Sequence, residues 1–385
     1  MLAENGIDVR YNVIKKRTEI DVPWLSGQTE NAEAVAMTHI QSLASRHLMP
    51  TGLVPAMTDA IADKFSYNPA AEWINERPWD GTDRLPDICN TIKPKAGYLL
   101  ALRDLLVRKW LMSVTAAAVL PDGFRCRGVL TLQGPQGIGK TSWGRRLIND
   151  DRLRDQLIKV DHHLDAGNKD SQLGAISHLI VEVGELDSSF RRDIARLKGF
   201  LTSGSDKIRP PYGRVAIETQ RRTVFYATVN ASDFLVDDTG NNRWWTIACE
   251  DIDDHHDIDM QQVYAQCAVM LKEGAKWWLT AEEEAMLERQ NSLHRSFSVI
   301  RDRLTAVINI EAIDALGAKA MTASEILIAA DVINPTNSQA KECARYLREW
   351  FGEPRRINGR DKWRVLLLAS EEEDIPIKPP KSKFD

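Results

Sequence analysis

The chain has 385 residues and a formal net charge of −5, with 43% hydrophobic and 27% charged residues. This composition is typical of a globular protein and excludes a wholly disordered or fibrous chain. No apolar run reaches the ~18 residues of a membrane helix, and the first residues lack the basic and apolar segments of a secretory signal. The sequence therefore predicts a cytoplasmic protein that has no membrane partner.

The N-terminal region, residues 1–95, is predicted to be of mixed and mostly helical structure. Apolar residues at helical spacing predict helices over 32–47 and 52–64. A turn follows at Pro78 and the Asp80-Gly81 pair.

The second predicted domain, residues 96–295, begins with a helix over 99–119 and has an α/β core. Short β-rich apolar runs separated by helical or polar segments are typical of a sheet that is covered on both faces. The clearest strands are expected at 128–133, 179–183 and 223–228. The acidic stretch Glu250–Asp259 is interpreted as a solvated loop, with metal binding as the alternative.

The third predicted domain, residues 296–370, has the element order of a winged helix. Capping boxes at Thr322-Ala-Ser-Glu325 and Thr336-Asn-Ser-Gln339 predict the starts of two helices. Asn358-Gly359 between β-rich runs predicts a type I′ hairpin, which would form the wing. A disordered tail is expected over 371–385.

A phosphate-binding loop is the strongest motif in the chain. Residues 134–141 match G-x-x-x-x-G-K-[ST] between a predicted strand and a predicted helix. Lys140 would reach the β- and γ-phosphates of ATP, and the Thr141 hydroxyl would bind Mg²⁺. The alternative is a chance glycine-rich turn. The residues predicted to bind ATP are Gly134, Pro135, Gln136, Gly137, Ile138, Gly139, Lys140, Thr141 and Ser142.

Acidic residues end the strand predicted at 179–183. Glu182 is assigned to the Mg²⁺ shell and Glu185 to activation of the attacking water. The acids are three residues apart rather than adjacent, so the two roles are open to exchange, and Asp187 is a third candidate. The alternative is a solvated turn that follows a core strand.

Two further residues complete the predicted catalytic set of Lys140, Glu182, Glu185, Asn230 and Arg243. Asn230 ends a strand, where its amide would contact the γ-phosphate or the lytic water. Arg243 follows in a turn, from which it would stabilise transition-state charge in a neighbouring subunit. The alternative for Arg243 is a surface arginine packed on Trp244.

Several motifs follow one another along the chain: Trp79-Asp-Gly-Thr-Asp-Arg, the phosphate-binding loop, Glu182-Val-Gly-Glu-Leu-Asp, Lys198-Gly-Phe-Leu-Thr, Asp206-Lys-Ile-Arg-Pro-Pro-Tyr-Gly-Arg, Ala227-Thr-Val-Asn and Gly240-Asn-Asn-Arg-Trp-Trp. Together, over about residues 65–250, these motifs resemble the virulence-associated protein E family. The resemblance implies a P-loop, AAA+-like ATPase of the superfamily 3 helicase type. Such a protein would form a homo-oligomeric ring, expected to be a hexamer, in the bacterial host cytoplasm. The chain is expected to be the helicase half of a phage or mobile-element replication system, naturally separate or acting with a separate primase.

Two basic segments are predicted to contact DNA. Between Ser188 and Arg222 there are nine Lys or Arg residues against three acids. Superfamily 3 proteins have a pore hairpin here, so the resemblance assigns Lys207, Arg209, Tyr212 and Arg214 to single-stranded DNA. Pairing with carboxylates at a subunit interface is the alternative for some of these cations. In the predicted winged helix, five basic residues are expected to contact double-stranded DNA: Lys341, Arg345, Arg348, Arg360 and Lys362. The alternative is that this domain contacts another protein or that its basic face is only solvated.

Four functional hypotheses follow from these motifs. The first is an ATP-driven DNA helicase, and the second is a P-loop initiator, loader or DNA-dependent switch without processive unwinding. The third is a DNA-binding regulator with a decayed loop, which the intact catalytic set argues against. The fourth, a small-molecule kinase, would need neither the DNA module nor Arg243.

Overall fold

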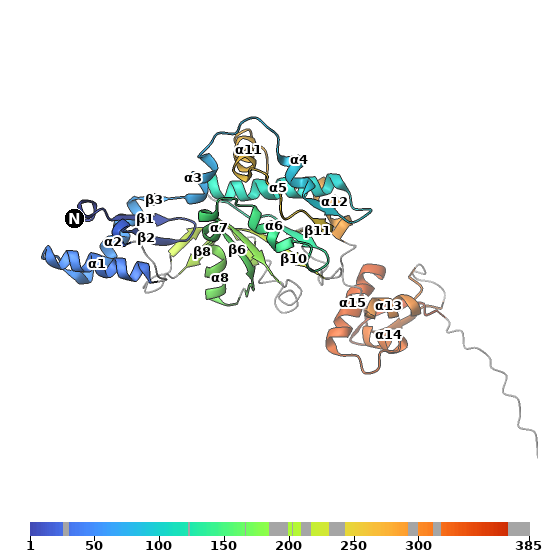
Figure 1. Cartoon of the computed structure of the whole chain (residues 1–385). Coiled ribbons are helices and arrows are strands. Elements are labelled where there is room, and N and C mark those ends of the chain that lie inside the picture. Colours follow the sequence, from blue (N-terminus) through green and yellow to red (C-terminus); the bar gives the residue numbers. More distant parts are fainter. Residues whose placement is uncertain are drawn as a thin grey trace, which may run out of the picture. The chain divides into compact units, whose positions relative to one another are not determined.

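The computed structural model describes residues 1–25, 31–121, 124–165, 167–184, 199–201, 203–208, 217–230, 243–291, 299–310 and 317–368. The chain forms two compact units, Met1–Arg295 and Ser296–Asp385 (Figure 1). The predicted phosphate-binding loop lies in the first unit, and the predicted wing lies in the second.

The N-terminal part of the first unit is a small sheet covered by two helices. Its strands pair in the order β2-β1-β3, with β1 (Asp8–Asn12) antiparallel to β2 (Arg17–Asp21) and parallel to β3 (Ser66–Tyr67). Helices α1 (Ala32–Arg46) and α2 (Val54–Lys64) pack on this sheet around a separate apolar core. The two predicted helices are confirmed, although α2 begins at Val54 after a single 3-10 turn.

The turn between β1 and β2 contacts the rest of the unit through Lys15 and His178. The Lys15 ammonium lies 2.9 Å from His178 Nε2, and His178 Nδ1 lies 3.0 Å from the carbonyl oxygen of Gly174. Lys15 donates to Nε2 and Nδ1 donates to the carbonyl, so the ring is neutral. Burial, with a smaller contribution from Lys15, lowers the pKa of His178 to about 4. His178 therefore has a structural role.

The central sheet of the first unit has the strand order β4-β11-β5-β10-β7-β6. All neighbouring strands from β11 to β6 are parallel, and only β4 is antiparallel to its neighbour. This parallel sheet confirms the predicted α/β core. The bounds are β4 (Ile92–Pro94), β5 (Val129–Gln133), β6 (Ile158–His162), β7 (Ile180–Val183), β10 (Val224–Val229) and β11 (Trp244–Ile252).

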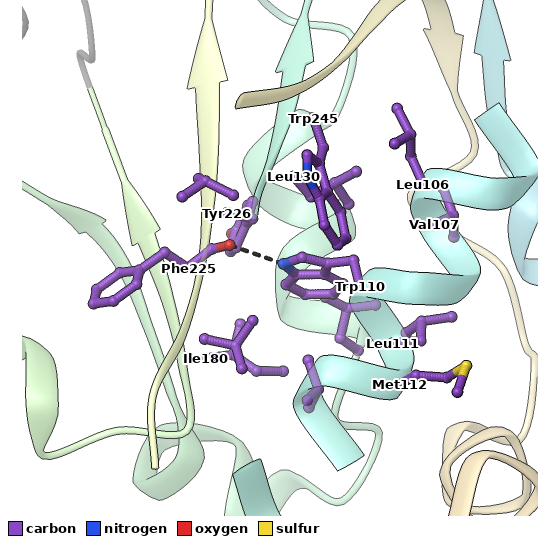
Figure 2. Packing of buried hydrophobic residues seen from close by; sticks show 14 of the residues in the cluster. Leu106, Val107, Trp110, Leu111, Met112, Leu130, Ile180, Phe225, Tyr226 and Trp245 are labelled. Atoms are coloured by element: carbon purple, nitrogen blue, oxygen red, sulfur yellow. Dashed lines mark hydrogen bonds between the residues drawn. The ribbon is translucent and has the colours of Figure 1, made fainter. Parts of the chain in front are cut away.

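Helix α5 (Leu100–Val119) packs on one face of the central sheet, and α11 (Met260–Lys272) packs against α5 (Figure 1). Trp110 of α5 is fully buried, and its indole Nε1 donates to the carbonyl oxygen of Phe225 at 2.8 Å (Figure 2). The hydrogen bond satisfies the one polar atom of a large apolar side chain. Further helices among the described residues of this unit are α3 (Pro69–Asn75), α4 (Leu85–Asn90), α6 (Lys140–Arg146), α7 (Asp151–Leu157), α8 (Lys169–Ile176) and α12 (Ala281–Asn291).

The second unit combines three helices with a three-stranded sheet of order β12-β14-β13. Both predicted capping boxes are formed, at Thr322 and at Thr336. Asn358 and Gly359 have φ of 52° and 75°, as the predicted type I′ turn requires. The elements are α13 (Val299–Val307), β12 (Lys319–Met321), α14 (Ala323–Ala329), α15 (Asn337–Phe351), β13 (Arg355–Ile357) and β14 (Arg360–Val365).

Across the described ranges, no helix combines the length and the apolar character needed to cross a membrane.

Gly128, directly before β5, leaves no space for a side chain. A Cβ atom built there would lie 1.9 Å from the indole ring of Trp245, which is 1% exposed. We expect Gly128→Ala to lower the free energy of unfolding by about 1–3 kcal/mol or more, because the overpacked core must shift. Gly52→Ala is the control, since a Cβ atom at that position would have nothing within 4 Å. Denaturant unfolding with equal losses for both variants would contradict this view of Gly128.

Candidate functional site

The loop of residues 134–139 leaves the carboxyl edge of the central sheet between β5 and α6. The Gly134 amide donates to the carbonyl oxygen of Val229 at 3.0 Å, which ties the start of the loop to β10. Gly137 and Gly139 have φ of 87° and 88°, in the left-handed region that side chains disfavour. These glycines let the loop turn tightly into α6, whose first residue is Lys140.

Lys140 is held inside this turn. Its side chain is nearly buried, and its ammonium donates to the carbonyl oxygens of Gly134 and Pro135 at 2.8 and 2.6 Å. A third proton goes to Asn230 Oδ1 at 3.0 Å, so the structure brings these two predicted residues together. Burial lowers the pKa of the Lys140 ammonium.

Glu182 lies at the centre of the same sheet edge and is 1% exposed. Its Oε1 accepts hydrogen bonds from the hydroxyls of Thr141 and Thr228, at 2.6 and 2.9 Å. Its Oε2 accepts the backbone N–H of Asp161 at 3.0 Å. A buried carboxylate is stable only when donors surround it in this way. The two side chains predicted to hold Mg²⁺, those of Thr141 and Glu182, are therefore in direct contact.

A cavity of about 830 Å³ opens where these groups meet. Seven of the predicted residues line this cavity: Gln136, Gly137, Gly139, Lys140, Thr141, Ser142 and Asn230. Gly134, Pro135 and Ile138 lie in the same loop but do not line the cavity. Glu182, which is buried in β7, does not line it either.

Four polar side chains that the sequence did not predict also line the cavity: Arg145, Asp161, Thr228 and Asp254. Thr228 and Asp161 end strands β10 and β6, which flank β7. Polar residues at strand ends therefore indicate candidate cavity residues in the sequence. Which of them meet at the cavity depends on the order of the strands in the sheet. Asp161 also has a φ of 51°, which is uncommon outside glycine.

Asp254 corrects the interpretation of the acidic stretch Glu250–Asp259 as a solvated loop. Strand β11 extends through Ile252, and the chain then turns back over the predicted phosphate-binding loop. A Cβ atom at Gly139 would lie 2.7 Å from the Asp254 carboxyl carbon. The main chain of this segment is held by Arg146, whose Nε lies 3.3 Å from the Asp254 carbonyl oxygen.

Glu185 and Asp187 lie outside the described residues, so the geometry bears only on Glu182. In the part of the chain that is described, no three His, Cys, Asp or Glu residues form a metal-binding group. Oxygen ligands that suit Mg²⁺ are nevertheless present in the Thr141 hydroxyl and the Glu182 carboxylate, 2.6 Å apart.

Arg243 lies at the other edge of the central sheet. It directly precedes β11, and Trp244 of that strand pairs with Val129, the first residue of β5. The predicted phosphate-binding loop follows the last residue of β5, so this loop and Arg243 are separated by a strand of five residues, roughly 17 Å. Arg243 lines a different cavity, with Arg125 and Arg127.

Lys207 is the one predicted pore residue in the described part of the chain; Arg209, Tyr212 and Arg214 lie outside it. Lys207 is exposed on β8 (Ser205–Ile208), which pairs antiparallel with β9 (Ile217–Gln220). The predicted hairpin position is thus occupied by two antiparallel strands.

Two arginines counted in the basic stretch before residue 223 have structural roles instead. Arg221 is fully buried, where it makes a bidentate ion pair with Asp206 and donates to the Phe200 carbonyl oxygen at 3.0 Å. Arg222 donates to carbonyl oxygens at the end of α5, among them that of Ala117 at 3.0 Å. The exposed positive charge near β8 and β9 is therefore smaller than the sequence count indicates.

The predicted basic residues of the second unit lie on α15 and β14. Lys341, Arg348 and Arg360 are exposed, although Arg348 lies 3.4 Å from the Glu353 carboxylate. The Arg345 guanidinium lies over the Tyr346 ring, 4.6 Å from its centroid. Lys362 lies 3.8 Å from the carboxylate of Glu325, the capping residue of α14.

The model of the virulence-associated protein E-like domain matches residues 74–296. The chain belongs to this family. The match spans the central sheet, the predicted phosphate-binding loop and Arg243. It begins within the last two residues of α3 and ends before α13.

Among solved structures, an apo form of the NrS-1 C-terminal region (residues 305–718) matches with a TM-score of 0.43 and 14% identity. The match covers 95% of this chain and 97% of that one. Two A-form apo structures of the same region match with TM-scores of 0.39 and 0.40 and identities of 12% and 14%, each covering 95% of this chain and 98% of that one. These scores are too low to carry a functional inference. No curated protein matches the sequence.

Proposed function

We propose that this virulence-associated protein E family member is an ATP hydrolase with a P-loop, AAA+-like core of the superfamily 3 helicase type. The observation that carries the proposal is the cluster of Lys140, Asn230 and Thr141 around one cavity, with the buried Glu182 carboxylate in hydrogen-bond contact with Thr141. These side chains come from three adjacent structural elements and meet at the carboxyl edge of a parallel sheet, where ligands bind in open α/β folds.

Each group has a distinct part in the proposed hydrolysis. The loop amides and Lys140 bind the β- and γ-phosphates of ATP. Thr141 and Glu182 would hold Mg²⁺, which neutralises phosphate charge when bound. Glu185 accepts a proton from water as the water oxygen bonds to the γ-phosphorus. The bond from that phosphorus to the bridging oxygen breaks, so ADP and phosphate are released. Asn230 orients the water or the γ-phosphate.

The position of Arg243 supports a site that is shared between subunits. Arg243 lies at the opposite sheet edge from the loop of its own chain, so it would serve the ATP of a neighbour in a ring, in our proposal a hexamer. Hydrolysis around the ring would drive translocation on DNA. We assign this activity to phage or mobile-element replication in a bacterial cytoplasm, alone or with a separate primase.

DNA contacts are proposed for both units. In the first, Lys207 and the residues that join β8 to β9 would contact single-stranded DNA in the ring channel. In the second, α14, α15 and the β13–β14 hairpin have the order of a winged helix. Its helix α15 would enter the major groove of a duplex while Arg360 on the wing contacts the backbone.

The direct test is ATP turnover with and without single-stranded DNA. Lys140→Ala should lower kcat by at least about a hundredfold, because the cation at the transferred phosphate is lost. Lys93→Ala is the control, since Lys93 is exposed and pairs with Asp251. Near-normal hydrolysis by folded Lys140→Ala would contradict the assignment. A strand-displacement assay then separates a helicase from an initiator or loader that hydrolyses ATP without unwinding.

The division of roles between Glu182 and Glu185 is testable with isosteric changes. Glu185→Gln should bind ATP normally and lower turnover by about 10²–10⁴-fold, because the acceptor for the water proton is lost. Glu182→Gln should chiefly lower the affinity for Mg²⁺, so that turnover requires a higher Mg²⁺ concentration. The measurement is a magnesium titration of both binding and turnover. If Glu182→Gln alone blocks turnover with ATP and Mg²⁺ bound, the two roles are reversed.

Removal of the residues from 318 onward should leave DNA-independent ATP hydrolysis within about twofold of the full chain, because the site lies in the other unit. Affinity for duplex DNA should fall, and the salt dependence of binding should become shallower as fewer phosphates are neutralised. Fluorescence anisotropy over a range of salt concentrations measures both. Unchanged duplex binding would favour a protein-contact role for this unit.

The shared site predicts complementation between inactive subunits. Arg243→Ala and Lys140→Ala should each hydrolyse ATP slowly, because each lacks a different half of the site. In a mixture with subunit exchange, some interfaces pair an intact loop with an intact arginine, so about a quarter of the activity should return. Full turnover by an isolated wild-type monomer would refute the shared site.

A further inference from the structure

Arg243 belongs to a cluster of three arginines around a second cavity. This cavity has a volume of about 370 Å³ and lies at the amino edge of the central sheet. Its wall includes Arg125, Arg127 and Arg243, together with Trp245 and Trp278. Glu284 is the one carboxylate among the described residues of the wall.

The sheet itself brings two of the arginines together. Arg127 lies two residues before β5 and Arg243 lies directly before β11, and these strands are parallel neighbours. The indole of Trp245 packs against Gly128 so closely that no Cβ would fit between them. This contact fixes the register of β5 against β11 next to the two arginines.

Arg125 joins the cluster from the preceding segment. Its carbonyl oxygen accepts the indole N–H of Trp277 at 3.2 Å, which fixes the backbone. Its side chain lies near Gly204, where a Cβ would come within 3.0 Å of Arg125 Cγ.

The charges in this cavity are not balanced. Within the described part of the chain, no ion pair involves Arg125, Arg127 or Arg243. Three guanidinium groups therefore face one carboxylate, that of Glu284. Guanidinium stays charged at any physiological pH and has the planar geometry that binds phosphate oxygens in pairs. A compact cavity with this excess charge suits a single phosphate group.

We propose that this cavity receives the γ-phosphate of the ATP bound to a second copy of the chain, with Arg127 and Arg125 acting beside Arg243. The inference rests on the proposed function and extends its site by two residues. The cavity and the phosphate-binding loop lie at opposite ends of the same strands, so the two can meet only between copies packed head to tail. The alternative ligand is a DNA backbone phosphate, but the cavity is compact, whereas a strand runs along an open groove.

The test uses the full chain with Arg127→Ala, Arg125→Ala and Arg127→Lys. The control is Arg152→Ala, whose side chain is 90% exposed and pairs with Asp150. The measurements are binding of a fluorescent ATP analogue, ATP turnover in the absence of DNA, DNA binding by fluorescence anisotropy, and sedimentation with ATPγS or ADP. Circular dichroism verifies that each variant folds.

We expect Arg127→Ala and Arg125→Ala to bind the analogue within about twofold of wild type, because their own loop is intact. Turnover should fall by about tenfold to a hundredfold, and Arg127→Lys should restore part of it. Assembly driven by ATPγS, but not by ADP, should weaken in both alanine variants. Mixing Arg127→Ala with Lys140→Ala should recover activity. If Arg127 acted only within its own subunit, the mixture would stay inactive.

Three outcomes overturn the inference. They are wild-type turnover in both alanine variants, an equal loss in the Arg152→Ala control, and a defect confined to DNA binding, which would assign the cavity to a DNA phosphate. A wild-type chain that assembles with ATPγS through these arginines but does not hydrolyse ATP would instead refute the proposed function and leave the phosphate contact standing.

Discussion

The buried carboxylate of Glu182 is the constraint on which the arrangement of the site depends. An ionised carboxylate in a sheet interior is destabilising by several kcal/mol unless donors replace the lost water. Here the donors are Thr141 of α6, Thr228 of β10 and the backbone of Asp161 in β6. Three elements that are distant in sequence are thus held at one point. Because Thr141 is the second residue of α6, the same contact fixes the start of that helix and the position of Lys140.

Close packing under α6 reinforces this constraint. A Cβ atom at Gly144 would lie 1.9 Å from the hydroxyl of Tyr226, so the helix can approach β10 only because residue 144 is glycine. Burial and the nearby Glu182 carboxylate raise the pKa of Tyr226 well above its usual range, which keeps the phenol neutral. The glycines at 137, 139 and 144 therefore have separate tasks, two in turning the loop and one in packing the helix.

Features with local causes were predictable from the sequence. The capping boxes, the Asn358-Gly359 turn and the strand before the loop each depend on a few consecutive residues, and all are present. Contacts that depend on strand order were not predictable. Asp161 lines the cavity because β6 lies beside β7, and no spacing in the sequence encodes that adjacency. Charge counting failed for Arg221, because a basic residue beside a hydrophobic strand is equally consistent with a buried ion pair.

The direction of the strands explains why the proposed site needs more than one chain. In a parallel sheet, the carboxyl ends of all strands lie along one side of the sheet, and their amino ends lie along the other. The proposed phosphate-binding loop lies on the carboxyl side. Groups placed before β5 and β11 can never fold back onto the loop after β5 without crossing the sheet. Head-to-tail packing brings the two edges together, and repetition of that contact gives a ring if the rotation closes and a filament if it does not. The angle between subunits, rather than any residue of the site, thus decides which assembly completes it.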